Sequence, residues 1–209
     1  MKILKLVFPL LIIAAIFQRC QENKTVDTYV LDADNSLVEW YGYSDNNTTS
    51  GSIKFTANDI KVEKGRIKSG TVTIPVSTIT DFIHPEDLAT INLEQIKNTE
   101  ILDALLHPVI VFEIREVALL SGIHPTAVPG ANWWIRGDMT MMGQTHQLSF
   151  PAKIYFNAND MEVEAKFTID HTKWEMNLDN NPLLGKDPIP PFLDLYLKGK
   201  ARINNKVII

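Results

Sequence analysis

The chain has 209 residues, of which 45% are apolar and 22% are charged, a balance that is ordinary for a globular protein. Its formal net charge is −5 at pH 7, which excludes a general electrostatic attraction to nucleic acid or to anionic lipid head groups. The length suits one all-β domain or two small domains.

The first twenty residues are typical of a secretory signal peptide. Lys2 and Lys5 precede an uncharged apolar run, residues 6–17, that is too short to span a bilayer comfortably. We therefore predict export, either to the periplasm or to a membrane-tethered place in the cell envelope. A retained N-terminal anchor is the alternative. Loss of residues 1–19 would leave 17 basic and 25 acidic residues, a net charge of −8.

Cys20 is the only cysteine, which excludes an internal disulfide and a cysteine-based metal site. A single cysteine directly after a signal sequence resembles the acylated first residue of a bacterial lipoprotein. Lipidation of Cys20, with a membrane tether, is therefore one hypothesis. Arg19 and Phe17 depart from that pattern, which has a small residue before the cysteine and an aliphatic residue three before it. Export without lipidation stays open.

Residues 21–28 are predicted to form a polar tether, followed by one domain over residues 29–203. Apolar and polar residues alternate along most of this domain, which indicates strands with one buried face. Lys64-Gly65 predicts the turn of a hairpin. Pro75 lacks an N–H donor, so it is expected at an edge, at a bulge or at the end of its strand.

Residues 85–107 interrupt the strands. Their apolar residues recur at helical spacing, which predicts a short helical insertion that ends before Pro108. Within it, Glu100 to Leu106 is predicted as a separate short helix. A second segment without period, the proline-rich residues 177–191, is our candidate for a flap over a binding site.

The clearest alternation lies in residues 133–150. Trp133, Ile135, Met139 and Met141 share one face, and Gly143-Gln144-Thr145 predicts the turn of a hairpin. Because a hairpin cannot bury its apolar face alone, other strands must cover it. The chain contains roughly eight such strands, which favours a β-sandwich or a closed barrel.

An eight-stranded barrel is just wide enough to hold one small or elongated ligand. In a sandwich the alternating apolar residues would be a solid core, whereas in a barrel they would line a cavity. A long apolar chain needs such a wall, because burial of each methylene contributes about 0.8 kcal/mol. The candidate ligand-binding residues are Trp40, Phe55, Ile74, Phe112, Trp133, Met139, Met141, Phe150 and Phe167.

Five segments in order resemble the YceI-like family of exported lipid- and polyisoprenoid-binding proteins. They are Ser36 to Trp40, Gly51 to Phe55, Glu100 to Phe112, Gly137 to Thr145 and Phe167 to Trp174. The resemblance implies an extended, antiparallel, eight-stranded lipocalin-like barrel around a long apolar cavity. It implies a ligand that is an isoprenoid, quinone-like or fatty chain, and a homodimer stays open. A β-sandwich interaction module of the cell envelope is the alternative.

Signals for catalysis are weak. The five histidines show no His-x-His or His-Glu-x-x-His spacing, so we predict no metal site and no cofactor besides a bound lipid. Asp170, His171 and Ser149 are the residue types of a hydrolytic triad, but no nucleophile-elbow sequence frames a serine. We predict that the protein is not an enzyme. Asp170 is expected to accept backbone donors at a strand end, with His171 either as its pH-dependent partner or as a solvated turn residue.

Overall fold

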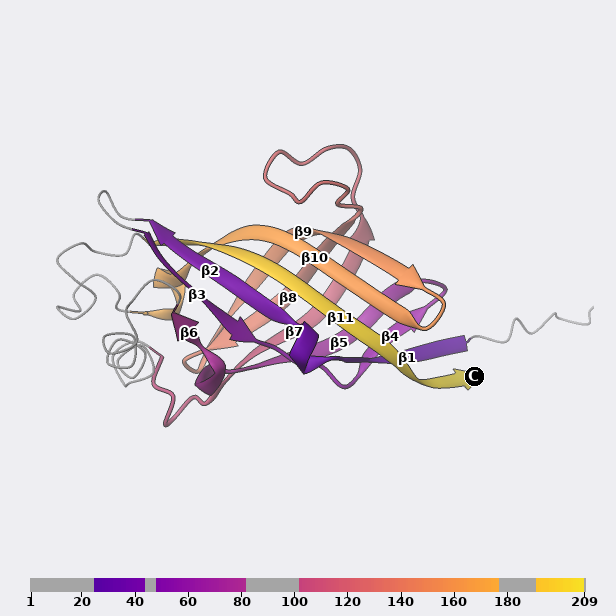
Figure 1. The fold of residues 1–209 in the computed structure, drawn as a ribbon, viewed down its shortest axis with the longest axis horizontal. Coiled ribbons are helices and arrows are strands. Elements are labelled where there is room, and N and C mark those ends of the chain that lie inside the picture. Colours follow the sequence, from indigo (N-terminus) through magenta and orange to yellow (C-terminus); the bar gives the residue numbers. More distant parts are fainter. Residues whose placement is uncertain (1–24, 44–47, 82–101, 177–190, 209) are drawn as a thin grey trace, which may run out of the picture.

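Eleven antiparallel strands form one sheet in the computed structural model, which describes residues 25–43, 48–81, 102–176 and 191–208. The strand order is β1-β4-β5-β7-β8-β9-β10-β11-β2-β3-β6, and an additional pairing of β1 with β11 closes the sheet (Figure 1). The strands are β1 (Thr25–Leu31), β2 (Leu37–Tyr43), β3 (Thr48–Lys54), β4 (Ile60–Glu63), β5 (Arg66–Pro75), β6 (Thr80–Asp81), β7 (Val109–Leu119), β8 (Trp133–Met141), β9 (Gln144–Asn157), β10 (Asp160–Asp170) and β11 (Phe192–Ile208).

Eight of these strands form the closed ring: β1, β4, β5, β7, β8, β9, β10 and β11. The predicted eight-stranded antiparallel barrel is therefore confirmed, and the β-sandwich alternative is wrong. Closure gives each of these eight strands a paired neighbour on both sides, which removes the two free edges of an open sheet.

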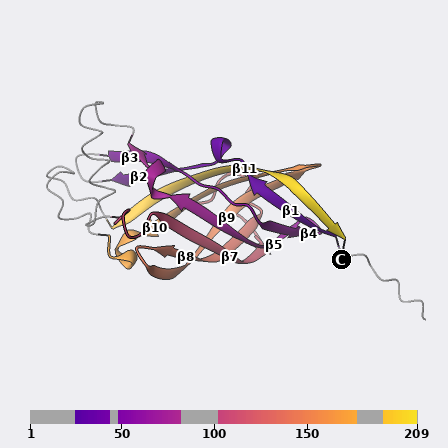
Figure 2. The same ribbon diagram turned by 90° about the horizontal axis from the view of Figure 1, so that it is seen from below.

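The long strand β11 holds the two ends of the barrel together. Its first half, Leu193 to Lys198, pairs with β2, and its second half, Ala201 to Ile208, pairs with β1 on the same edge. A short 3-10 turn, η2 (Ala33–Asn35), separates β1 from β2, and the Asp32 carboxylate accepts the backbone N–H of Asp34 there. Figures 1 and 2 both place β2 and β3 at one end of the barrel and β1 and β4 at the other.

β6 completes the wall at the β2 end. The chain leaves β5 after Pro75, which ends its strand as its missing N–H donor predicts. It then makes the 3-10 turn η3 (Val76–Thr78), and β6 pairs with β3 through Gly51 and Ser52. Below, "the Trp40 end" means the end formed by β2, β3 and β6, and "the Trp133 end" means the opposite one, where β8 begins.

Several predicted boundaries differ in the structure. Residues 25–28 belong to β1 and pair with β11 and β4, although we expected them in the tether. Two predicted features lie largely outside the described residues: the helical insertion, of which only residues 102–107 are described, and the flap, of which only Pro191 is. The prediction of a helix from Glu100 to Leu106 is wrong over its described part, which forms turns. The reason is Asp103, whose φ of 43° is incompatible with a right-handed helix.

The central hairpin is confirmed, with a shorter turn than predicted. β8 pairs with β9 from Trp133–Ala152 to Met141–Gln144, so the loop consists of Met142 and Gly143 alone. Both have positive φ, 51° and 74°, as a two-residue hairpin turn that follows the strand twist requires. Trp133, Ile135, Met139 and Met141 do share the inner face.

Candidate ligand cavity

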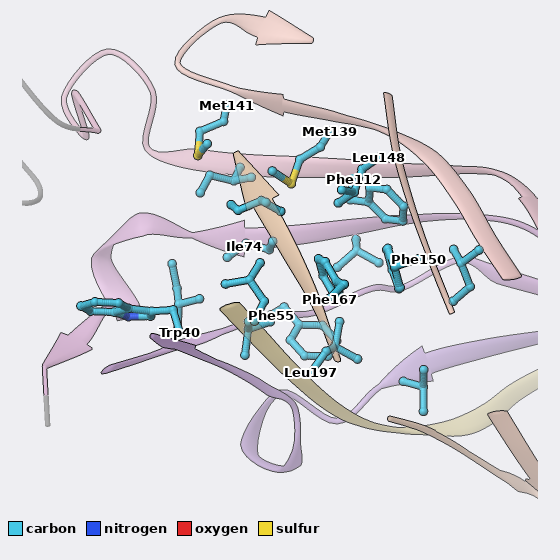
Figure 3. Close-up of a pocket in the computed structure, with 18 of the residues that line it drawn as sticks. Trp40, Phe55, Ile74, Phe112, Met139, Met141, Leu148, Phe150, Phe167 and Leu197 are labelled. Atoms are coloured by element: carbon cyan, nitrogen blue, oxygen red, sulfur yellow. The ribbon is translucent and has the colours of Figure 1, made fainter. Parts of the chain in front are cut away.

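The barrel interior contains a cavity whose walls, as far as the described residues form them, are apolar (Figure 3). Its volume is about 200 Å³, counted as the space that the centre of a water-sized sphere can occupy. Twenty-seven residues line it: Leu31, Val38, Trp40, Ile53, Phe55, Ile60, Ile67, Val72, Ile74, Ile79, Leu102, Ile110, Phe112, Ile114, Ile135, Met139, Met141, Leu148, Phe150, Met161, Val163, Phe167, Ile169, Met176, Leu193, Leu195 and Leu197.

The cavity is long and narrow. On β10 its lining runs from Met161 to Ile169, a path of about 26 Å at the usual rise of a strand. With the tilt common to barrel strands, this path corresponds to roughly 20 Å along the barrel axis. The lining includes loop residues Ile79, Leu102 and Met176 at the Trp40 end. The interior is therefore a slender channel that ends among loops on one side.

The Trp133 end is filled by side chains. Tyr29 is buried and meets Phe156 edge to face, with ring centroids 6.1 Å apart. Trp133 lies at the same end, with the Arg66 guanidinium carbon 5.9 Å from its ring centroid. These aromatic contacts close the channel at the Trp133 end.

Eight of the nine predicted binding residues line the cavity: Trp40, Phe55, Ile74, Phe112, Met139, Met141, Phe150 and Phe167. The ninth, Trp133, faces inward but does not line it. Trp133 lies at the start of β8, at the end of the barrel that inward side chains fill, and its ring contacts the Arg66 guanidinium there. The alternation along a strand, here called its parity, predicts which face of the sheet a residue lies on. It does not predict how far along the barrel axis the cavity extends.

Several lining residues were not predicted, because a bulge in β5 changes the parity of its inward face and because three of them lie outside the strands. Lys68 is an extra residue in β5, because Val62 pairs with Ile67 while its neighbour Lys61 pairs with Ser69. The bulge moves the inward face from Ile67 to Val72 and Ile74, which have the opposite parity. Ile79 and Met176 lie outside the regular strands and carry no periodic signal, and Leu102 belongs to the segment whose apolar residues recur at helical spacing.

Glycines on neighbouring strands make room for three cavity aromatics. A Cβ on Gly51 would lie 2.6 Å from the Trp40 ring, and one on Gly199 would lie 2.8 Å from Phe55. On Gly137 it would lie 2.5 Å from Phe112 Cζ and 2.4 Å from the Glu113 carbonyl oxygen. Because these rings lie against bare backbone, they line the channel without filling it.

A 3-10 turn after β10 seals the wall beside the Trp40 end. The β9–β10 pairing stops at Ala152–Ala165, and η4 (His171–Trp174) packs against β9 beyond it. The Trp174 indole Nε1 donates to the Met139 carbonyl oxygen at 3.2 Å, and its ring meets that of His146 at a centroid distance of 5.3 Å. Trp174 thus holds η4 against β8 and β9, beyond the point where the β9–β10 pairing stops.

Asp170 caps this turn. Its Oδ1 accepts the hydroxyl of Thr172 at 2.6 Å and the Thr172 backbone N–H at 3.1 Å. The hydroxyl bond is the largest cause of a lowered Asp170 pKa, and the charges of Lys173 and His171 contribute less. The expectation that Asp170 accepts backbone donors at a strand end is confirmed. His171 is fully buried, so it is not the solvated turn residue of the alternative prediction, and Ser149 is exposed.

The described residues, 25–43, 48–81, 102–176 and 191–208, contain no group of three or more His, Cys, Asp or Glu side chains placed to hold a metal ion. Across the same ranges, no helix has the length and apolar character that a membrane crossing requires.

Comparison with known proteins identifies the family. The model of the YceI-like domain matches residues 29–195, most of the chain. This chain belongs to the YceI-like family. A comparison with curated protein sequences gives no match.

Two solved structures resemble this YceI-like protein in fold. The crystal structure of Burkholderia cenocepacia BcnA has a TM-score of 0.64 at 16% identity, covering 81% of this chain and 98% of that one. A polyisoprenoid binding domain from Saccharophagus degradans, implicated in plant cell wall breakdown, has a TM-score of 0.64 at 8% identity, covering 85% of this chain and 99% of that one. At such low identity both matches show the shared barrel.

Proposed function

We propose that this YceI-like protein binds an isoprenoid or another long apolar chain inside its barrel and performs no chemistry on it. The observation that carries the proposal is the continuous channel lined by twenty-seven apolar residues. Family membership and the fold shared with a polyisoprenoid binding domain support it. The wall that residues 25–43, 48–81, 102–176 and 191–208 form offers no polar group for acid, base or nucleophilic catalysis, which favours carriage, storage or protection of the ligand.

The energetics favour a long chain over a short one. Burial of about ten methylenes contributes roughly 8 kcal/mol, which falls within the cost of association of about 4–15 kcal/mol and so leaves little or no net affinity. A chain that extends along the roughly 20 Å of channel buries more. Because the lining residues in the described part of the chain are all apolar, chain length and shape are expected to dominate affinity.

Native mass spectrometry of the gently purified protein tests the proposal. We expect an adduct whose mass corresponds to a single chain lipid, recoverable by organic extraction and restored by adding a polyprenol or a quinone to stripped protein. A matched control is Ile110→Asp, which places a carboxylate on the channel wall and should abolish the adduct, because an unpaired charge there is costly. Repeated absence of any adduct, with no uptake of either ligand, would refute the function.

We propose in addition that the protein acts in the cell envelope after export. The basic, apolar and Cys20 segments at the N-terminus support this location. Intact mass of the mature protein checks it, with Cys20→Ser as the control. A mass that begins at Cys20 and carries acyl chains lost in the variant indicates a membrane tether. A mature chain that begins elsewhere without acyl chains indicates the untethered form, and an uncleaved chain contradicts removal of the signal segment.

A further inference from the structure

Three phenylalanines stand side by side across the middle of the channel. Phe150 on β9 and Phe167 on β10 stack with ring centroids 4.1 Å apart and an interplanar angle of 12°. Phe112 on β7 adds a third ring, 5.8 Å from Phe150 and tilted by 40°. All three line the cavity, and Figure 3 shows them grouped there, with Trp40 set well apart. We call this set the phenylalanine arc.

Gly137 allows the phenylalanine arc to cross β8, the strand between β7 and β9. The Phe112 ring occupies the space that a Cβ on Gly137 would take. It therefore reaches Phe150 over bare backbone, and the arc is continuous from β7 to β10. Phe112 and Phe150 are 7% and 4% exposed, so these two rings are held by close packing.

The channel continues on both sides of the phenylalanine arc. On β7, Ile110 lines it toward the Trp40 end and Ile114 toward the Trp133 end. On β10, Ile169 lines the channel on the Trp40 side of Phe167, and Val163 lines it on the Trp133 side. A ligand long enough to use the whole channel must therefore pass the arc.

The remaining space is slender. The cavity volume of about 200 Å³, spread over roughly 20 Å of axis, gives a mean cross-section of about 10 Å² for the centre of a water-sized sphere. A single flexible chain can follow such a path. A rigid fused-ring skeleton would have to displace stacked rings from a packed wall, which is costly in protein interiors.

We propose that the phenylalanine arc is the specificity determinant of this cavity: it admits one flexible isoprenoid chain past mid-channel and excludes fused-ring lipids such as sterols. The inference rests on the proposed function and names the shape of ligand that the site takes. Phe167 is its most accessible member, since it is only half-buried.

Competition binding with two ligands, geranylgeraniol and cholesterol, tests the inference on lipid-stripped protein. We expect the wild type to bind geranylgeraniol and to bind cholesterol at least about 100-fold more weakly, a difference of roughly 2.7 kcal/mol. Phe167→Ala should narrow the affinity difference between the two ligands by about tenfold or more, because truncating an aromatic ring of the channel wall opens a void that an apolar group can enter.

Two further variants keep the test decisive. Phe167→Leu removes the aromatic stack with a smaller loss of volume, so it should fold if the alanine variant does not, and it should narrow the ratio in the same direction. Tyr155→Leu truncates an exposed aromatic residue of β9 outside the lining and should leave the affinity ratio of the two ligands unchanged. Urea unfolding of each variant confirms that binding is measured on folded protein.

The outcomes separate the two proposals. Binding of geranylgeraniol with equal binding of cholesterol, or ratios unaffected in both Phe167 variants, would overturn the role of the arc while leaving the chain-binding function intact. An equal change of the affinity ratio in Tyr155→Leu would also overturn it. Failure of the wild type to bind either ligand would overturn the proposed function, and the arc's role with it.

Discussion

At the scale of single residues, the channel depends on glycines that leave space for aromatic rings as much as on the rings themselves. Trp40, Phe55 and Phe112 lie over Gly51, Gly199 and Gly137, so their rings are part of the wall. The same rings over residues with side chains would have to point into the channel and fill it. Close packing makes such positions intolerant of even one added methyl group.

Gly137→Ala tests this directly. Its Cβ would lie 2.4 Å from the Glu113 carbonyl oxygen, which belongs to the backbone and has little freedom to move. We expect a loss of about 1–3 kcal/mol in the free energy of unfolding, measured in urea. Ser149→Ala, at an exposed position of the neighbouring strand β9, is the control and should change the free energy of unfolding by less than about 0.5 kcal/mol. Equal stability of Gly137→Ala and wild type would contradict the account of the wall.

At the scale of elements, tight hairpin turns fix which face each strand turns inward. The β4–β5 turn consists of Lys64 and Gly65, with φ of 51° and 71°. Two positive φ values suit Asn-Gly best, so Lys64 carries a conformational cost that its neighbour does not. The turn holds its register in spite of this residue, because the flanking apolar faces leave only one favourable alignment.

We expect Lys64→Asn to raise the free energy of unfolding by up to about 1 kcal/mol, because asparagine adopts positive φ more readily than lysine. Lys64→Gln removes the same charge, but glutamine does not adopt positive φ as readily as asparagine, so this variant should not raise the free energy of unfolding. Urea unfolding of the three proteins measures the difference. An identical gain in both variants would assign the effect to charge and would contradict the turn argument.

The η4 turn gives an element-scale prediction that depends on pH. The pKa of Asp170 is lowered in the folded protein, chiefly by the Thr172 hydroxyl. Its ionised form therefore contributes stability that is fully present above the unfolded pKa, near 3.8, and is lost as the pH falls through the lower folded value. The stability difference between wild type and Asp170→Asn should shrink across that window. Unfolding measured between pH 2 and 6 checks this, and a difference that stays constant with pH would contradict it.

At the scale of the whole molecule, closure of the sheet creates the interior that the function needs. β11 pairs with β10 on one edge and with β2 and then β1 on the other, so one strand links both ends of the barrel. A closed ring of eight strands has little room beyond its own side chains. The all-apolar channel therefore reflects the small and recessed residues on the inner wall as well as the strand number.

Alternation predicted most of this arrangement, because a period of two follows from strand geometry and survives wherever one face is buried. Eight of the nine candidate residues line the cavity, and Trp133 does not. Alternation predicts the face of a strand on which a residue lies, but it does not predict how far along the barrel axis the cavity extends. The bulges at Lys68 and Arg115 shift the inward face without a sequence signal. The turn at Asp103 replaced a predicted helix because helical spacing of apolar residues does not reveal a positive φ.

The central claim is that an apolar chain enters the barrel, and methionine methyl resonances report on it most directly. Met139, Met141, Met161 and Met176 line the cavity, whereas Met142 lies in the hairpin turn and does not. With ¹³C-methyl-labelled methionine, titration with geranylgeraniol should shift the four cavity signals and leave the Met142 signal nearly unchanged. Cavity signals that stay in place at saturating ligand, or a shift confined to Met142, would contradict binding inside the barrel.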